Sequence, residues 1–366
     1  MTTGSAAGTA ARGAAPGSTA GAVAARLPEP RGALSAAVLD VLAAPPPGPL
    51  PASPEAEAAD ADPYGDDLHL ALYVCYELHY RGFTGVSAAW EWDPELLRLR
   101  AALERVFLAA LRRDTRAHSP AGTASGAGAA DVADVAAALD ELLVEPAEGG
   151  GVSHFLLREG RWWQMREYFA HRSVYHLKEA DPHAWVIPRL DGQAKASLVA
   201  VEYDEFGGGH GDRVHARLFA DLMAGAGLDP SYLRYLDDVP APALATVNLM
   251  SLCGLHRALR GALVGHFAAA EITTAPSARR MARALERMGA APQCVLFFTE
   301  HIEADAVHEQ VMRRDVIGDL LAREPELASD VLFGVRATEL LEDRLADHLL
   351  DAWRRDACSL RHPLSA

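Results

Sequence analysis

The sequence is poor in cysteine and in long apolar runs. Its four cysteines, Cys75, Cys253, Cys294 and Cys358, lie far apart and form no CxxC pair, which favours reduced thiols over a disulfide framework or a zinc knuckle. No apolar run approaches the roughly 18 residues that a membrane span requires. The N-terminus also lacks a basic segment followed by an apolar one, as a signal peptide would have. We therefore expect a cytoplasmic protein with no membrane partner.

Basic residues are also scarce relative to acidic ones. The chain has 34 Lys and Arg against 50 Asp and Glu, a formal net charge of -16. Because binding nucleic acid requires clustered Lys and Arg, this balance argues against a nucleic-acid partner and favours a small-molecule ligand. Half of the 366 residues are hydrophobic, so most of the chain can fold around sizeable cores.

Composition divides the chain into three regions. Residues 1–62 are rich in Ala, Gly and Pro, so we expect a disordered tail with a short helix near residues 34–42. Residues 63–145 show apolar residues at three- and four-residue spacing and predict a helical extension, with a low-complexity insert near residues 119–130. Residues 146–360 form the main predicted domain.

The main domain is predicted to be helical nearly throughout. Its helices are expected near residues 160–180, 190–206, 212–226, 242–254, 255–270, 276–288, 294–321 and 324–355, separated at proline and glycine positions. Strand signals are sparse. The fold class is therefore predicted to be an all-α bundle.

Three titratable side chains share one face of a predicted helix in the segment QCVLFFTEHIEADAVHEQVMRRDV. His301, Asp305 and His308 stand at positions i, i+4 and i+7. Such groups are costly on an inward face unless something satisfies them, and a metal ion does so because imidazole and carboxylate are common ligands. A solvated acidic face with stray histidines explains the helix alone equally well.

Further donors lie on other predicted helices, as a metal site inside a bundle requires. Glu205 precedes a glycine run, His215 follows it, and Glu179 ends an upstream helix. A single buried Glu or His is more often a satisfied polar group than a ligand. The metal-site hypothesis therefore depends on the whole set.

Taken in order, Glu179, Glu205, His215 and then His301, Asp305 and His308 resemble the ligand pattern of the heme-oxygenase-like diiron oxidases and oxygenases, also called the iron-containing redox enzyme family. The phrases YELHYRGF, YHLKEADPHAWVIPRLDGQAK and HARLF are similar to members of that family. The resemblance spans roughly residues 70 to 355. It implies a heme-oxygenase-like helical bundle without heme, in which these six residues are the metal ligands and catalytic residues.

The resemblance also implies two iron ions, the second held in a labile site, with O2 as co-substrate and an external electron donor. The implied reaction is oxidation of a small amino-acid-like or amine substrate, with N-oxygenation favoured. Desaturation or carbon–carbon cleavage of a fatty or amino acid by the same site is the alternative. The sequence leaves the oligomeric state open, with a homodimer among the candidates.

Polar residues outside the ligand set are candidates for substrate binding. Glu77, Arg81 and Arg189 are charged residues in otherwise apolar or proline-containing surroundings, and an Arg can hold a carboxylate through two hydrogen bonds. Structural ion pairing is at least as good an explanation of all three.

Alternatives from other classes use different residues. A true heme oxygenase needs one proximal His, and a thiaminase-like member of the same fold needs a nucleophilic Cys and no metal. A metal-free helical binding protein needs none of these donors. Ferritin-type bundles carry paired Glu-x-x-His motifs, which this sequence lacks.

Overall fold

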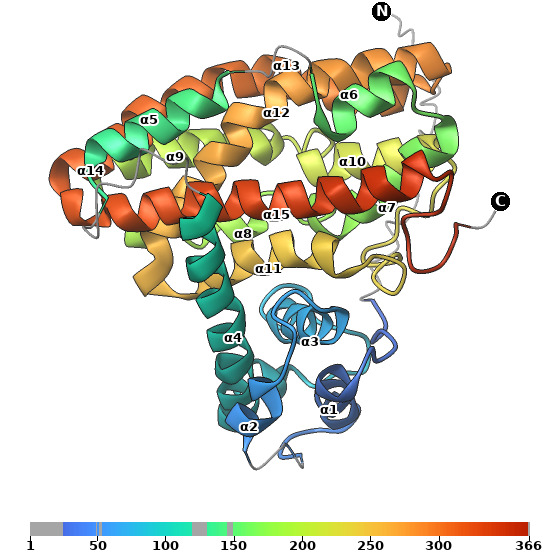
Figure 1. The fold of residues 1–366 in the computed structure, drawn as a ribbon, viewed down its shortest axis with the longest axis vertical. Coiled ribbons are helices and arrows are strands. Elements are labelled where there is room, and N and C mark those ends of the chain that lie inside the picture. The colour runs from blue at the N-terminus through green and yellow to red at the C-terminus, as the bar shows by residue number, and fades with distance from the viewer. Residues whose placement is uncertain (1–24, 49, 51–52, 119–129, 145–148, 365–366) are drawn as a thin grey trace, which may run out of the picture.

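The computed structural model describes residues 25–48, 50, 53–118, 130–144 and 149–364, and for residues 54, 55, 117, 118 and 303–306 it gives the backbone alone. Within these ranges the chain is helical, without a β-sheet, and an isolated bridge pairs Ala25 with Phe83. The predicted all-α fold class is confirmed (Figure 1). None of the helices in these ranges has the length and hydropathy that a membrane span needs.

The helices follow one another along the chain with short connections. The α-helices are α1 (Ala33–Leu42), α2 (Pro54–Ala59), α3 (Asp66–Glu77), α4 (Pro94–His118), α5 (Val132–Leu142), α6 (Gly151–Arg158), α7 (Trp162–His176), α8 (Asp181–Ala184), α9 (Gly192–Glu205), α10 (His215–Gly225), α11 (Ala241–Leu255), α12 (Arg260–Met288), α13 (Pro292–Gln310), α14 (Asp319–Arg323) and α15 (Ala328–Arg354). Short 3-10 helices cover Ala88–Trp92, Ile187–Arg189, Gly207–Gly209, Arg257–Leu259 and Pro325–Leu327, and a π-helix covers Val311–Gly318.

The centre of the bundle is formed by two long helices that cross closely. α12 packs along both α13 and α15, and α15 runs across the front of the molecule in Figure 1. A Cβ atom on Gly265 would lie 2.1 Å from the carbonyl oxygen of Val331, and one on Gly334 would lie 2.0 Å from that of Ala262. Both positions therefore require glycine, because any side chain would push α12 and α15 apart.

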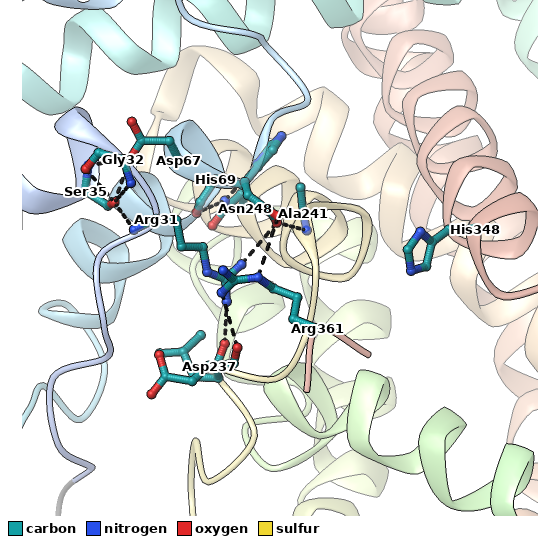
Figure 2. Close-up of polar contacts among 12 residues, drawn as sticks. Arg31, Gly32, Ser35, Asp67, His69, Asp237, Ala241, Asn248, His348 and Arg361 are labelled. Atoms are coloured by element: carbon teal, nitrogen blue, oxygen red, sulfur yellow. Dashed lines mark hydrogen bonds and ion pairs between the residues drawn. The ribbon is translucent and has the colours of Figure 1, made fainter. Parts of the chain in front are cut away.

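The N-terminal helices α1 to α3 form a separate layer below α11, and α4 reaches from this layer up to α15 (Figure 1). Figure 2 shows Asp67 at the start of α1, where its carboxylate accepts hydrogen bonds from the backbone N–H of Leu34 at 3.0 Å and of Ser35 at 2.7 Å. This contact satisfies donors that a helix N-terminus leaves free. Asn248 of α11 donates to the carbonyl of His69 in α3 at 2.9 Å, which ties this layer to the bundle.

The expected disorder of residues 1–62 is wrong for residues 25–48. Val38 and Leu42 of α1 are fully buried against the core, so the few large apolar residues of this segment suffice once α3 provides a surface to pack on. The short helix expected near residues 34–42 is confirmed. Residues 1–24, and nearly all of the low-complexity insert near 119–130, lie outside the described part of the chain, and the other predicted domain boundaries stay predictions.

A second difference concerns α12, which was expected as two helices with a break before Pro276. The structure has one helix that continues through Pro276. A proline inside a helix removes one backbone hydrogen bond and usually bends or ends it, but α12 packs extensively against α13 and α15. The continuous helix keeps Glu271, five residues before the proline, in register with α13.

Candidate metal centre

A turn of three glycines brings Glu205 and His215 together. Glu205 is the last residue of α9 and His215 the first of α10. Between them Gly207, Gly208 and Gly209 all have φ between 61° and 83°, a conformation that other residues rarely adopt. A Cβ on Gly207 would lie 2.6 Å from the backbone of Arg213. The sequence therefore folds α9 back onto α10 so tightly that Glu205 Oε2 lies 2.7 Å from His215 Nδ1.

Glu179 reaches the same place from the turn that follows α7. The next residue, Ala180, has a φ of 72°, a strained value for a residue with a side chain, and such strain is common at functional sites. His176, at the end of α7, contacts Glu179 Oε1 through its Nδ1 at 2.8 Å. Burial acts to raise the pKa of Glu179, but the charge and hydrogen bond of His176, with a smaller contribution from the nearby His301, hold that pKa well below its usual value.

α13 contributes two histidines seven residues apart. Pro292 stands in its first turn, a position that needs no backbone N–H. His301 Nδ1 donates to the carbonyl oxygen of Phe297, one turn earlier, at 2.7 Å. This bond fixes the tautomer, so that Nε2 carries the lone pair, and Nε2 lies 3.8 Å from Glu179 Oε1.

The donors gather into two buried groups that share one residue. Glu179, Glu205, His215 and His301 each offer a donor atom within 4.8 Å of the others, and Glu205, Glu271 and His308 do the same. His308 Nδ1 lies 3.0 Å from Glu271 Oε2 and 3.7 Å from Glu205 Oε1. Glu205 therefore faces one group with each of its carboxylate oxygens, as a ligand that bridges two metal ions would.

The first group fits a cation better than it fits internal hydrogen bonding. His215 Nδ1 lies 2.7 Å from Glu205 Oε2, yet it makes no hydrogen bond with any described residue, and Glu179 Oε2 likewise has no hydrogen-bond partner among them. All four residues are at most 7% exposed. Buried polar atoms at close range without hydrogen bonds are costly, and an ion held between imidazole nitrogen and carboxylate oxygen would satisfy them.

The second group contains Glu271 of α12, which the sequence analysis missed. It stands in the run HFAAAEITTAP, which has no other carboxylate at helical spacing. The signal available in the sequence was an isolated Glu in an alanine-rich stretch. Burial raises its pKa even though the hydrogen bond with His308 acts to lower it.

The six predicted ligands are placed as follows. Glu179, Glu205, His215 and His301 lie in the first group and His308 in the second. Asp305 lies in α13 between the two histidines, but its side chain is outside the described part of the structure. Its role as a ligand stays a prediction.

A cavity of about 470 Å³ adjoins the first group. Its wall includes Glu179, Glu205, Glu271 and His301 together with the aromatic side chains of Phe267, Phe297, Phe298, Tyr168 and Tyr175. Cavities of this size, largely apolar with a few convergent polar groups, are typical of small-molecule sites. A substrate in this cavity would reach the donor atoms directly.

The three predicted substrate-binding residues do not line this cavity. Glu77 is fully buried, with Lys178 Nζ at 2.9 Å and the Tyr232 hydroxyl at 2.8 Å. Arg81 stacks on the Tyr232 ring at 4.2 Å and lines a different hollow of about 390 Å³. Structural ion pairing therefore accounts for Glu77, and Arg81 is held by the Tyr232 ring and by the carbonyl oxygen of Leu177 at 3.1 Å. Arg189, on the 3-10 helix after α8, is also absent from the cavity wall.

The four cysteines offer no nucleophile to the cavity. None of them is in its wall, and Cys75, Cys253 and Cys294 are buried. Burial raises the pKa of each, to about 12 for Cys75, Cys253 and Cys358. Because the thiolate is the reactive form, the thiaminase-like alternative has no support in this structure.

Comparison with known proteins agrees with the fold and the donors. The family model of the iron-containing redox enzymes matches residues 166–343, the part of the chain that contains all six predicted ligands and Glu271. A nitrosourea synthase of Streptomyces achromogenes subsp. streptozoticus is 25% identical over 245 residues, covering 67% of this chain and 50% of the relative. The chain thus spans about half the length of this curated relative.

Residues 166–343, which contain both donor groups, are therefore similar to the iron-containing redox enzymes.

Proposed function

We propose that the chain is a non-heme diiron oxygenase that uses O2 to oxidise a nitrogen atom of an amine substrate. The observation that carries this proposal is Glu205, whose two carboxylate oxygens belong to two adjacent groups of buried donors. One group alone would hold a single ion. Two groups with a shared carboxylate suit a dinuclear centre, which performs the electron transfer to O2 when both ions are bound.

The charge of the donors supports two ions. Glu179, Glu205 and Glu271 are buried carboxylates, and Asp305 is predicted to be the fourth. Two ferrous ions carry four positive charges, so four carboxylates would leave the centre close to neutral. One ion among the same groups would leave an uncompensated buried negative charge, which is costly.

The residues around the donors orient them and keep water away. His176 fixes Glu179 and the Phe297 carbonyl fixes His301, as described above. Phe267, Phe297 and Phe298 supply the apolar part of the cavity wall. The Tyr175 phenol also lines the cavity, and burial together with the nearby carboxylates raises its pKa well above 10, so that it keeps its proton and can donate it as a hydrogen bond.

Two observations favour an amine as the substrate. Apart from the proposed metal ligands, the charged residues of the cavity wall are the carboxylates of Glu339, Glu342 and Asp343 and the guanidiniums of Arg172 and Arg280. An excess of negative charge attracts a cationic group. The relative's name, nitrosourea synthase, refers to a product with an oxidised nitrogen.

Iron removal and product analysis test this function. The metal-free protein is loaded with ferrous ion without oxygen, mixed with ¹⁸O2 and a panel of amines, and followed by an oxygen electrode and mass spectrometry. We expect oxygen consumption that needs iron, that a ferrous chelator abolishes, and that yields a product carrying ¹⁸O on nitrogen. A product that has lost two hydrogens without label would instead favour desaturation. No iron-dependent uptake at all would favour a metal-free binding protein.

A further inference from the structure

Two buried histidines line the cavity but belong to neither donor group. His183 lies in α8 and His266 in the first half of α12. Each is 1% exposed, and each is part of the cavity wall. Three of their four ring nitrogens, both of His183 and Nε2 of His266, have no hydrogen-bond partner among the described residues. Buried nitrogens at a cavity wall that lack partners point to a ligand that supplies them.

The tautomer of His266 follows from its hydrogen bonds. The Thr338 hydroxyl donates its single proton to the carbonyl oxygen of Gly334 at 2.8 Å. His266 Nδ1 lies 2.7 Å from the same hydroxyl oxygen, which can only accept there, so Nδ1 carries the ring proton. Burial lowers the pKa of His266 to about 4, and the ring is therefore neutral at physiological pH. Its Nε2 is left as a bare acceptor that requires a donor from the ligand.

His183 adds a second acceptor beside the first. Its ring stacks on Phe267 with centroids 4.2 Å apart and lies 5.3 Å from the ring of His266. Burial, and then the neighbouring His266, lowers its pKa well below 6.5. A neutral imidazole has one N–H and one lone pair, so the two rings together present two lone pairs and a single free N–H.

The charge of the surrounding wall selects the kind of donor. The Arg172 guanidinium of the cavity wall is bound to both carboxylate oxygens of Glu342 at 2.8 Å and 2.5 Å, so it is not free to hold an anion. Apart from this pair and the proposed metal ligands, the wall has two carboxylates, those of Glu339 and Asp343, and one guanidinium, that of Arg280. A cationic N–H donor therefore suits this place better than a carboxylate or a neutral hydroxyl.

We propose that His183 and His266 form a subsite that binds a second, cationic nitrogen of the substrate, an ammonium or guanidinium group, through His266 Nε2 and one ring nitrogen of His183. The inference rests on the proposed function in one respect: the first nitrogen of the same substrate is the one that is oxidised. The substrate class is thereby narrowed to molecules with two basic nitrogens.

Matched pairs of ligands test the subsite without turnover. We would titrate 1,3-diaminopropane through 1,6-diaminohexane, each beside the monoamine of equal chain length, into the protein by calorimetry. The iron-loaded protein is kept free of oxygen, and the metal-free protein is titrated in parallel. At least one diamine is expected to bind about tenfold more tightly than its monoamine, the gain of one charge-assisted hydrogen bond. Equal binding of every pair overturns the proposal, as does tighter binding of the matching amino acid, in which a carboxylate replaces the second amine.

Two substitutions of one residue separate recognition from folding. In His266→Asn the side-chain amide can still donate to Thr338, but the acceptor that Nε2 provided is lost. We expect the tenfold advantage of the diamine to disappear while monoamine binding is unchanged. In His266→Gln the amide oxygen takes the place of Nε2, and the advantage should be kept within about threefold. A diamine advantage that survives His266→Asn overturns the proposal.

A third variant, His183→Phe, keeps the stacking on Phe267 and removes both nitrogens. We expect it to reduce the diamine advantage as well, and an undiminished advantage would remove His183 from the subsite. Because binding is measured without oxygen, this experiment tests the subsite separately from the oxidation reaction. A diamine preference without iron-dependent oxidation would leave the subsite standing without the proposed function, and oxidation without the preference would do the reverse.

Discussion

Glu205→Gln is expected to lower iron-dependent oxygen consumption by at least about a hundredfold and to leave less than one iron per chain after loading. Glu205 contacts His215 in one donor group and His308 in the other. A neutral amide is a poor ligand for iron in place of a carboxylate. Loss of a residue that only hydrogen-bonds to a metal ligand already costs about 10- to 100-fold in activity or metal affinity. Loss of a ligand shared by both groups should therefore cost more.

The matched control is Glu300→Gln, which removes the same charge next to His301. Glu300 pairs with Arg213 at 3.1 Å, and its side chain is 36% exposed. Its replacement should leave iron content and oxygen consumption within about twofold of the wild type, as expected for a surface pair. Two irons per chain and full activity in the Glu205 variant would rule out the shared carboxylate.

Glu202→Gln is expected to stabilise the metal-free protein by about 2 kcal/mol at pH 8. Glu202 is 2% exposed, and neither carboxylate oxygen has a hydrogen-bond partner among the described residues. Burial first, and then the charges of Glu205 and Glu271, raise its pKa to about 9. The folded protein therefore holds Glu202 protonated at pH values where the unfolded chain has released the proton.

The direction of the pH dependence follows. A carboxyl group whose pKa is raised by folding contributes its full stability below pH 4.5 and loses it as the pH approaches 9. Burial acts to lower the pKa of His308, but its hydrogen bond with Glu271 and the charges of Glu271 and Glu205 raise it from 6.5 to about 9, so its contribution declines from pH 6.5 upward. Both groups make the metal-free protein less stable as the pH rises.

Urea unfolding of metal-free protein from pH 5 to pH 9 measures this effect. The wild type should lose stability across the whole range, whereas Glu202→Gln should lose it less steeply, because Glu271 and His308 still titrate but Glu202 no longer does. Glu326→Gln, at an exposed position, should follow the wild type. Identical slopes for wild type and Glu202→Gln would mean that Glu202 is ionised in the folded protein.

The parts of the fold that depend on local sequence could be predicted. The apolar spacing of α9, α10 and α13 and the three glycines after Glu205 are local signals, and they placed Glu205, His215 and His301 near helix ends or on one helix face. The helix near residues 34–42 could also be predicted from its local sequence. Its packing could not, because whether a short apolar stretch is buried depends on the surface that α3 offers.

The contacts between distant segments could not be predicted from periodicity. Glu271 meets His308 because α12 packs against α13, which its own sequence does not reveal. Glu77 was a plausible substrate ligand until its pairing with Lys178, 101 residues away, was visible. The tautomer of His266 could not be predicted either, because it is set by Thr338 in the distant helix α15. Sequence spacing identifies which groups share a face, but tertiary packing decides which faces meet.

The location of iron in crystals tests the central claim most directly. Diffraction from protein loaded with ferrous ion, recorded on both sides of the iron absorption edge, should give two anomalous peaks on either side of Glu205. One peak is expected among Glu179, His215 and His301 and the other beside Glu271 and His308. Iron found elsewhere would contradict the account. So would crystals that contain iron but in which these donors still contact one another instead of the metal.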